Sequence, residues 1–211
     1  MIPPNTKRVR RHDQDRLSDL PDCVLIHILS FLDTKDTVQT CILSTRWKYL
    51  WKTIPTLILH TAGFCSIEKF AIFVSKIWTL RDTKTPLHAL DLQLAMDVIA
   101  DSYAILSCVS SCRALASLKL HGYHKMTMLT ALSPFQPFNS LHSLTIACCT
   151  VLSLVPNLFK VKLHSLCNLK SLKVKGGVST SATIPGRIVD FLLQNSPTAN
   201  VDLIDHWIRI K

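Results

Sequence analysis

Nine histidines and eight cysteines are the side chains of this 211-residue chain that could hold a metal ion or attack a substrate. Their spacing supports neither role. No Cys-x-x-Cys pair occurs, and His121 and His124 flank Gly122-Tyr123 outside any metal-binding motif. A Gly-x-Ser-x-Gly elbow and a phosphate-binding glycine loop are also absent from the sequence. Spacing leaves a cysteine–histidine nucleophilic pair open, but no feature favours it. We therefore expect no catalytic residues, no metal and no cofactor.

The charge of the chain is unevenly distributed. The formal net charge is +10, of which residues 1–16 contribute +3, residues 17–53 contribute none and residues 54–211 contribute +7. A basic surface could bind nucleic acid, but neither a recognition helix nor a basic strand with interleaved aromatic residues accompanies it. A basic nucleic-acid-binding protein is therefore only an alternative, and it predicts a steep loss of binding between about 50 and 200 mM salt.

The elements that would position binding residues begin with a helix after residue 20. Pro21 suits the first turn of a helix, and Asp22 suits the positive end of the helix dipole. An apolar stripe at helical spacing follows, consisting of Val24, Leu25, Ile28, Leu29 and Leu32.

Two more short helices are expected before residue 54. Thr34 is the expected N-cap of the second helix, and Ser44 is that of the third, on which Trp47 and Trp51 lie one turn apart. The second helix is expected to turn Val38, Cys41 and Ile42 inward. Three helices of this length cannot bury so much apolar surface alone, so they imply a partner.

The order of these motifs resembles the plant-type F-box. The matching segments are Asp-Arg-Leu-Ser-x-Leu-Pro-Asp at 15–22, Ile-Leu-Ser-Phe-Leu at 28–32, Thr-Lys at 34–35, and Leu-Ser-x-Arg-Trp at 43–47 followed by Leu50-Trp51. The resemblance implies binding to a Skp1-type adaptor and, through it, to the cullin of a ubiquitin ligase. Carried over by position, the adaptor contacts fall on Leu20, Pro21, Val24, Ile28 and Leu29. Trp47 and Trp51 are expected to hold the F-box against the segment that follows.

An internal repeat organises the chain beyond residue 53. The pattern apolar-x-x-apolar-x-apolar starts at residues 54, 87, 115, 141 and 169, with separations of 33, 28, 26 and 28 residues. Its copies are Ile54/Leu57/Leu59, Leu87/Leu90/Leu92, Leu115/Leu118/Leu120, Leu141/Leu144/Ile146, Leu169/Leu172/Val174 and a weak sixth, Val201/Leu203. This spacing predicts leucine-rich repeats, each with one strand and one helix.

Helices are expected before three of the copies, at residues 70–78, 99–109 and 188–192, whereas Pro134 and Pro137 break the one before the fourth copy. An F-box followed by irregular leucine-rich repeats is an arrangement of plant F-box proteins, so the resemblance covers both parts. It implies an α+β fold, with a three-helix F-box and a short, irregular leucine-rich-repeat solenoid of about five repeats.

The expected domains are a disordered basic tail at residues 1–14, the F-box at residues 15–53 and the repeats at residues 54–211. The sequence up to Lys211 contains no convincing capping unit, so we expect the last repeat to present an open edge. A short paralogue or a truncated gene product would explain this.

Strand geometry predicts which residues the repeats present. The second and third apolar positions of each copy point into the core, so the residue between them and the residue after them lie on the opposite, concave face. These residues are Ile58, His60, Asp91, Gln93, Lys119, His121, Thr145, Ala147, Lys173 and Lys175. We hypothesise that a client offers acidic or phosphorylated groups to Lys119, His121, Lys173 and Lys175. The alternative is that they only solubilise an unused face.

Neither a membrane nor secretion is expected. Residues 126–159 hold no charged side chain, but Pro134, Pro137 and Pro156 interrupt them, and their apolar runs are shorter than the roughly 20 residues of a spanning helix. The N-terminus lacks the apolar segment of a signal peptide. The expected location is the nucleus and/or the cytoplasm, with residues 7–11 serving as a nuclear import patch or as part of a disordered tail.

The functional prediction is a non-catalytic substrate-recognition adaptor of an SCF ubiquitin ligase, which binds the Skp1-type adaptor through the F-box and an unknown client through the repeats. An F-box protein that has no client to ubiquitinate is a further alternative.

Overall fold

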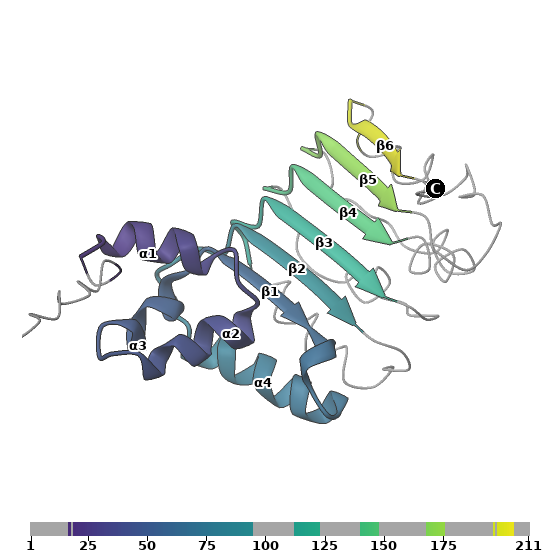
Figure 1. The fold of residues 1–211 in the computed structure, drawn as a ribbon. Coiled ribbons are helices and arrows are strands. Elements are labelled where there is room, and N and C mark those ends of the chain that lie inside the picture. Colours follow the sequence, from purple (N-terminus) through teal and green to yellow (C-terminus); the bar gives the residue numbers. More distant parts are fainter. Residues whose placement is uncertain are drawn as a thin grey trace, which may run out of the picture.

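The computed structural model describes residue 17 and residues 19–94, 112–122, 140–147, 168–175, 196 and 198–204. Short helices come first in the chain and lie beside a sheet whose strands follow one another in sequence order (Figure 1). The fold therefore mixes helices with a parallel sheet, as expected. Within the described ranges, every helix is too short or too polar to cross a bilayer.

The N-terminal helices follow one another closely. They are α1 Asp22–Leu29, α2 Thr34–Gln39, the 3-10 helix η1 Thr40–Ile42, α3 Trp47–Leu50 and the 3-10 helix η2 Trp51–Thr53. Pro21 is the N-cap of α1 and not part of its first turn, and its carbonyl accepts the N–H of Val24 at 3.0 Å. Asp22 lies in the first turn, as predicted.

The caps of the next two helices differ from the prediction. Asp33, not Thr34, caps α2, because its Oδ1 accepts the N–H of Lys35 at 2.8 Å. The side chain of Ser44 does not cap α3, which begins three residues further along at Trp47.

Ile42 is exposed, although the sequence pattern predicts that it points inward. Its exposed fraction is 84%, whereas Val38 and Cys41 are partly buried against the core. The chain tightens from α2 into η1 before this residue. A 3-10 helix has three residues per turn, so a period of 3.6 no longer predicts which side a residue faces.

Six strands form one parallel sheet. They are β1 Thr56–His60, β2 Ala89–Leu94, β3 Ser117–Gly122, β4 Ser143–Ala147, β5 Ser171–Lys175 and β6 Asn200–Ile204. One row across the sheet contains Leu57, Leu90, Leu118, Leu144, Leu172 and Val201. The strands predicted from the apolar pattern are therefore confirmed, and the copies lie in register.

The chain between β1 and β2 forms the 3-10 helix η3 Thr61–Gly63 and the helix α4 Ile67–Leu80. This confirms the helix predicted at residues 70–78, and Phe70, Val74 and Ile77 are its buried residues. The helices predicted at residues 99–109 and 188–192 lie outside the described residues.

One hydrophobic core runs from the N-terminal helices into the sheet. Trp47, Leu50 and Trp51 belong to the same buried cluster as the strand leucines and the buried face of α4. The two tryptophans are 7% and 5% exposed. They therefore belong to the core that the N-terminal helices share with the sheet.

The N-terminal helices also cover the outer edge of β1. Thr34 is 1% exposed, and its Oγ1 accepts the backbone N–H of Ile58 at 2.9 Å. Edge strands carry unpaired N–H groups, and here a side chain of α2 satisfies one of them. Thr37 is likewise buried, and its hydroxyl lies 3.0 Å from the carbonyl oxygen of Asp33.

Thr34→Val is expected to destabilise the protein by about 1–3 kcal/mol, because the isosteric side chain leaves the Ile58 N–H without its acceptor. Urea unfolding followed by circular dichroism measures the change. The control is Thr79→Val on the exposed side of α4, which is expected to stay within about 0.5 kcal/mol. Equal effects of the two variants would refute a special role for Thr34.

Candidate functional site

Helix α1 carries apolar side chains on two faces. Leu25 and Leu29 are 0% and 1% exposed and belong to the core, whereas Val24 and Ile28 are each 39% exposed. The structure therefore places the predicted adaptor contacts in different environments. Pro21, Val24 and Ile28 lie at the surface, and Leu20 is partly buried.

Leu29 is a correction to the predicted contact set. Its side chain packs in the protein's own core and offers no surface to a partner. A helix that is apolar on two sides reads as one broad stripe in the sequence, so the periodicity did not separate the inner residues from the outer ones.

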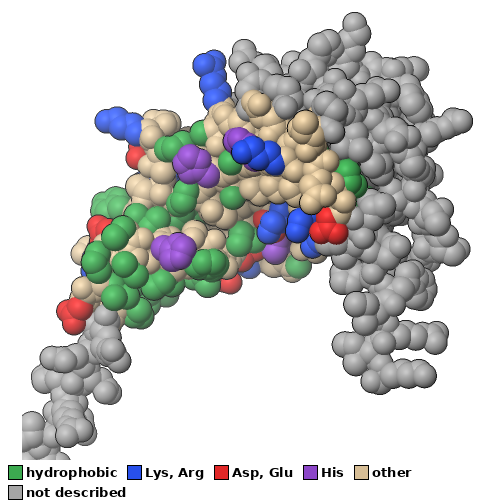
Figure 2. Space-filling view, turned by 90° about the horizontal axis from the view of Figure 1, so that it is seen from above, with side chains coloured by type: hydrophobic (Ala, Val, Ile, Leu, Met, Phe, Trp, Pro, Cys, Tyr) green, Lys and Arg blue, Asp and Glu red, His purple; other side chains and the backbone are tan. Residues whose placement is uncertain are grey.

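The N-terminal segment exposes more apolar surface than the sequence prediction included. Its exposed large apolar side chains are Leu17, Val24, Ile28, Phe31, Leu32, Ile42, Leu43 and Tyr49, which we call the helical apolar surface. Figure 2 shows hydrophobic side chains gathered over this end of the molecule. Large exposed apolar surfaces of this kind mark binding sites.

Phe31 and Ile42 are the most exposed members of this surface, at 71% and 84%. Phe31 contacts the ring of His27 edge-on, with centroids 4.9 Å apart. Phe31 follows Ile28 by three residues, and this helical spacing could have predicted that Phe31 lies on the same exposed side as Ile28. Ile42 follows a change of helix type and gives no such signal.

Arg46 joins α3 to the beginning of α1. Its Nη2 lies 2.6 Å from Oδ1 of Asp22, its Nε donates to the same oxygen at 2.7 Å, and its Nη2 also donates to the carbonyl of Leu20. The Leu-Pro-Asp and Arg-Trp motifs, which lie more than twenty residues apart, therefore form one structural unit.

The second candidate site is the sheet face that carries the predicted client residues, on which Lys119 and Asp202 are exposed whereas Thr145 is buried. One row across the strands contains Ile58, Asp91, Lys119, Thr145, Lys173 and Asp202. On the same face, His60, Gln93 and His121 are paired in turn, and Ala147 is paired with Lys175. The structure thus places Lys119 and Lys173 in one row, separated by Thr145, as the strand geometry predicts.

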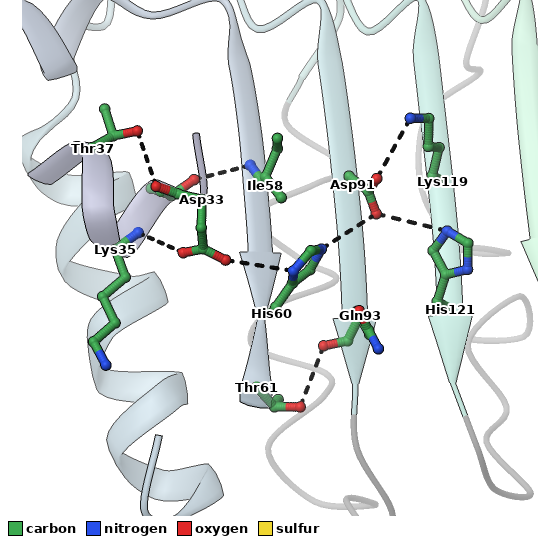
Figure 3. Close-up of polar contacts among 11 residues, drawn as sticks. Asp33, Lys35, Thr37, Ile58, His60, Thr61, Asp91, Gln93, Lys119 and His121 are labelled. Atoms are coloured by element: carbon green, nitrogen blue, oxygen red, sulfur yellow. Dashed lines mark hydrogen bonds and ion pairs between the residues drawn. The ribbon is translucent and has the colours of Figure 1, made fainter. Parts of the chain in front are cut away.

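Asp91 is the centre of a polar cluster on this face (Figure 3). Its Oδ2 lies 3.5 Å from Nζ of Lys119, and its Oδ1 lies 3.8 Å from Nε2 of both His60 and His121. Asp91 Oδ1 is buried and accepts no hydrogen bond. His60 also approaches the α2 cap, with its Nδ1 3.5 Å from Oδ2 of Asp33, so the cluster reaches the N-terminal helices.

The sheet face is less basic than predicted. Asp91 pairs with Lys119, and Asp202 pairs with Lys173 at 3.6 Å. Asp202 belongs to the weak sixth copy, which the sequence argument left out of the face. Of its three lysines, Lys175 is the one without an ion pair among the described residues. The described ranges also contain no group of three side chains suited to hold a metal ion.

Burial lowers the pKa of His121 below its ordinary value of 6.5, and the charges of Lys175, Lys119 and His60 add to this effect, whereas Asp91 opposes it. The folded state therefore favours the neutral imidazole, and the unfolded chain binds more protons just below pH 6.5.

Stability is accordingly expected to fall as the pH decreases through 6.5 towards the lowered pKa of His121. His121→Gln is expected to lose less unfolding free energy than the unmodified chain between pH 7.5 and about pH 5.5. The reason is that the glutamine side chain does not titrate in this range. Urea unfolding at the two pH values measures this. An unchanged pH dependence in the variant would contradict the expectation.

Comparison with known proteins identifies the N-terminal part. Residues 17–59 match the F-box domain family. Similar proteins from Arabidopsis thaliana include an FBD-associated F-box protein, 47% identical over 74 residues, which is 35% of this chain and 17% of the relative. Two F-box/FBD/LRR-repeat proteins are 38% and 31% identical over 45% and 54% of this chain, which cover 21% and 26% of their own lengths.

The matched part thus spans about a quarter or less of the length of each of these relatives. Within this chain, the helical apolar surface and Arg46 lie in the matched F-box domain. Residues 17–59 of this chain are therefore similar to F-box domains, and the relatives named above are F-box proteins of Arabidopsis thaliana, two of which also carry LRR repeats in their names.

Proposed function

We propose that the protein is a substrate-recognition adaptor of an SCF-type ubiquitin ligase, which binds a Skp1-type adaptor through the helical apolar surface. F-box domains generally act as non-catalytic adaptors. The observation that carries the proposal is an F-box domain whose exposed side includes Ile28, Phe31 and Ile42.

The energetic case rests on removing this apolar surface from water. Fully burying one large apolar side chain contributes about 1.5–3 kcal/mol. Several such side chains, buried together, outweigh the cost of association and reach the roughly 8 kcal/mol of a micromolar complex. Without the adaptor, these apolar side chains stay exposed to water and would favour self-association of the chain.

We further infer that β1 to β6 are the strands of a leucine-rich-repeat arc. Six parallel strands in sequence order, aligned by one row of five leucines and Val201, support this. The polar face of such an arc is the surface on which the client binds, with Lys119, His121, Lys173 and Lys175 contacting it.

The ligase mechanism that follows is proximity. The F-box holds the chain on the adaptor and cullin, and the sheet face holds a client, so that the client's lysines have a high effective concentration near the charged ubiquitin-conjugating enzyme. No bond is made or broken by this chain itself in that mechanism.

The direct test is titration of the full chain with a purified Skp1-type adaptor, followed by size-exclusion chromatography. We expect a one-to-one complex at micromolar concentration. A chain that remains monomeric and does not bind the adaptor at that concentration would contradict the proposal.

The client-binding part has its own test. Lys173→Glu together with Lys175→Glu is expected to remove client proteins that co-purify with the full chain under proteasome inhibition, because like charges then repel an acidic client. The adaptor is expected to co-purify unchanged. The matched control is Lys69→Glu with Lys76→Glu, which makes the same charge change on the exposed side of α4. Equal client recovery from the two double variants would exclude this face.

A further inference from the structure

A cavity of about 430 Å³ lies where α4 ends and where β2 and β3 begin. Its lining residues are different from those of the helical apolar surface and from those of the sheet face that carries the predicted client residues. Its apolar walls are Trp78, Pro86, Leu87 and Ala114, and its polar walls are Arg81, Asp82, Thr83, Thr85, Cys112 and Arg113. The volume falls in the range of small-molecule sites in proteins.

Arg81 is held rigidly in the wall of this cavity. Its backbone N–H closes the last turn of α4 on the carbonyl of Ile77 at 2.9 Å, and its Nη2 donates to the carbonyl of Ile54 at 2.7 Å. Its Nε is buried and makes no hydrogen bond. No carboxylate in the described part of the chain lies within ion-pair distance of it.

The environment of Arg81 is unfavourable to its charge. Burial lowers the pKa of Arg81, and this outweighs the opposing influence of Cys112 and Asp82. A partly buried guanidinium without a carboxylate partner is costly unless an anion reaches it.

Asp82 does not neutralise the cavity, although it lines it. Its Oδ1 accepts the N–H of Lys84 at 3.0 Å, and its Oδ2 accepts the hydroxyl of Thr85 at 2.9 Å. Both oxygens are therefore engaged within the loop that follows α4. These bonds also lower the pKa of Asp82 and keep it ionised.

A second arginine, Arg113, also lines this cavity. Arg113 is exposed, and its backbone carbonyl accepts the hydroxyl of Ser140 at 2.8 Å, which connects this loop to the start of the next strand segment. Its side chain makes no ion pair within the described ranges. With Arg81 and Asp82, the cavity carries a formal net charge of one positive unit.

We propose that this cavity binds a small organic carboxylate whose apolar body lies against Trp78 and Leu87 and whose carboxylate pairs with Arg81 and Arg113. Guanidinium groups bind carboxylates through paired, charge-assisted hydrogen bonds. The apolar walls provide contact area and the two arginines provide selectivity for the anion. Neither adaptor binding nor client binding depends on this site, so the inference goes beyond the proposed function.

The test uses the full chain with cinnamate as the probe and cinnamamide as its uncharged counterpart, measured by ligand-observed NMR and calorimetry. Cinnamate is expected to bind saturably, and cinnamamide at least tenfold more weakly. Arg113→Gln is expected to weaken cinnamate at least tenfold. Lys84→Gln, which removes one exposed positive charge from the neighbouring loop, is expected to change the affinity less than twofold.

Arg113→Gln is the decisive variant because Arg81 also holds the carbonyl of Ile54, so that changing Arg81 disturbs the fold. The proposal is overturned if cinnamate and cinnamamide bind equally, if Arg113→Gln and Lys84→Gln weaken binding equally, or if no saturable binding occurs up to about 10 mM.

Discussion

Val24→Asp combined with Ile28→Asp is expected to weaken binding of a Skp1-type adaptor at least 100-fold while the protein stays folded. Each side chain is 39% exposed on α1, so a carboxylate there remains hydrated in the free chain. In the complex, both carboxylates would be buried without a partner, which is costly. Calorimetric titration with the purified adaptor measures the loss, and circular dichroism verifies the fold.

The matched control for this variant is Ile72→Asp combined with Leu80→Asp on α4. These side chains are 56% and 51% exposed, so the control introduces the same two carboxylates at exposed apolar positions outside the F-box domain. Adaptor affinity is expected to stay within twofold of the unmodified chain. If the Val24/Ile28 variant bound the adaptor as well as the control, the helical apolar surface would not be the adaptor site.

Phe70→Ala is expected to cost about 3–5 kcal/mol of unfolding free energy, the usual range for removing a buried aromatic ring. Phe70 is 0% exposed and, among the residues that the structure describes, it has the largest fully buried side chain. Its ring packs edge-on against that of Phe64, with centroids 5.3 Å apart. Urea unfolding monitored by circular dichroism measures the change.

Ile72→Ala, two residues along the same helix, provides the comparison. Because Ile72 lies on the exposed side of α4, its truncation is expected to stay within about 0.5 kcal/mol. A cost below about 1 kcal/mol for Phe70→Ala would mean that α4 does not pack against the sheet as described.

The strands were predictable because their signal is periodic and repeated. Leu90 and Leu118 occupy equivalent places in successive copies, and they become neighbours in the sheet. A pattern in which alternate residues are apolar identifies the buried side of each strand without any knowledge of the partners. The weak sixth copy shares the register, since Val201 pairs with Leu172.

The candidate sites were predictable only in part. The helical period identifies α1 as apolar but does not tell that Leu29 is buried and Val24 is exposed, because both positions are apolar. The exposure of Ile42 depends on the change into η1. The ion pair between Lys173 and Asp202 joins residues of two different strands, so it cannot be predicted from the sequence around either residue.

The sequence by itself determined the F-box domain, the positions of the strands and the row of residues that each strand presents, because these depend on local order and spacing. Only the tertiary structure decided which side of α1 faces the core and that Thr34 accepts a backbone N–H at the edge of β1. It also decided that Asp91 lies close to His60, Lys119 and His121, and that two arginines line one cavity. These features join residues that are distant in the chain, and their energies depend on burial and on distances of a few ångströms, which spacing along a sequence does not contain.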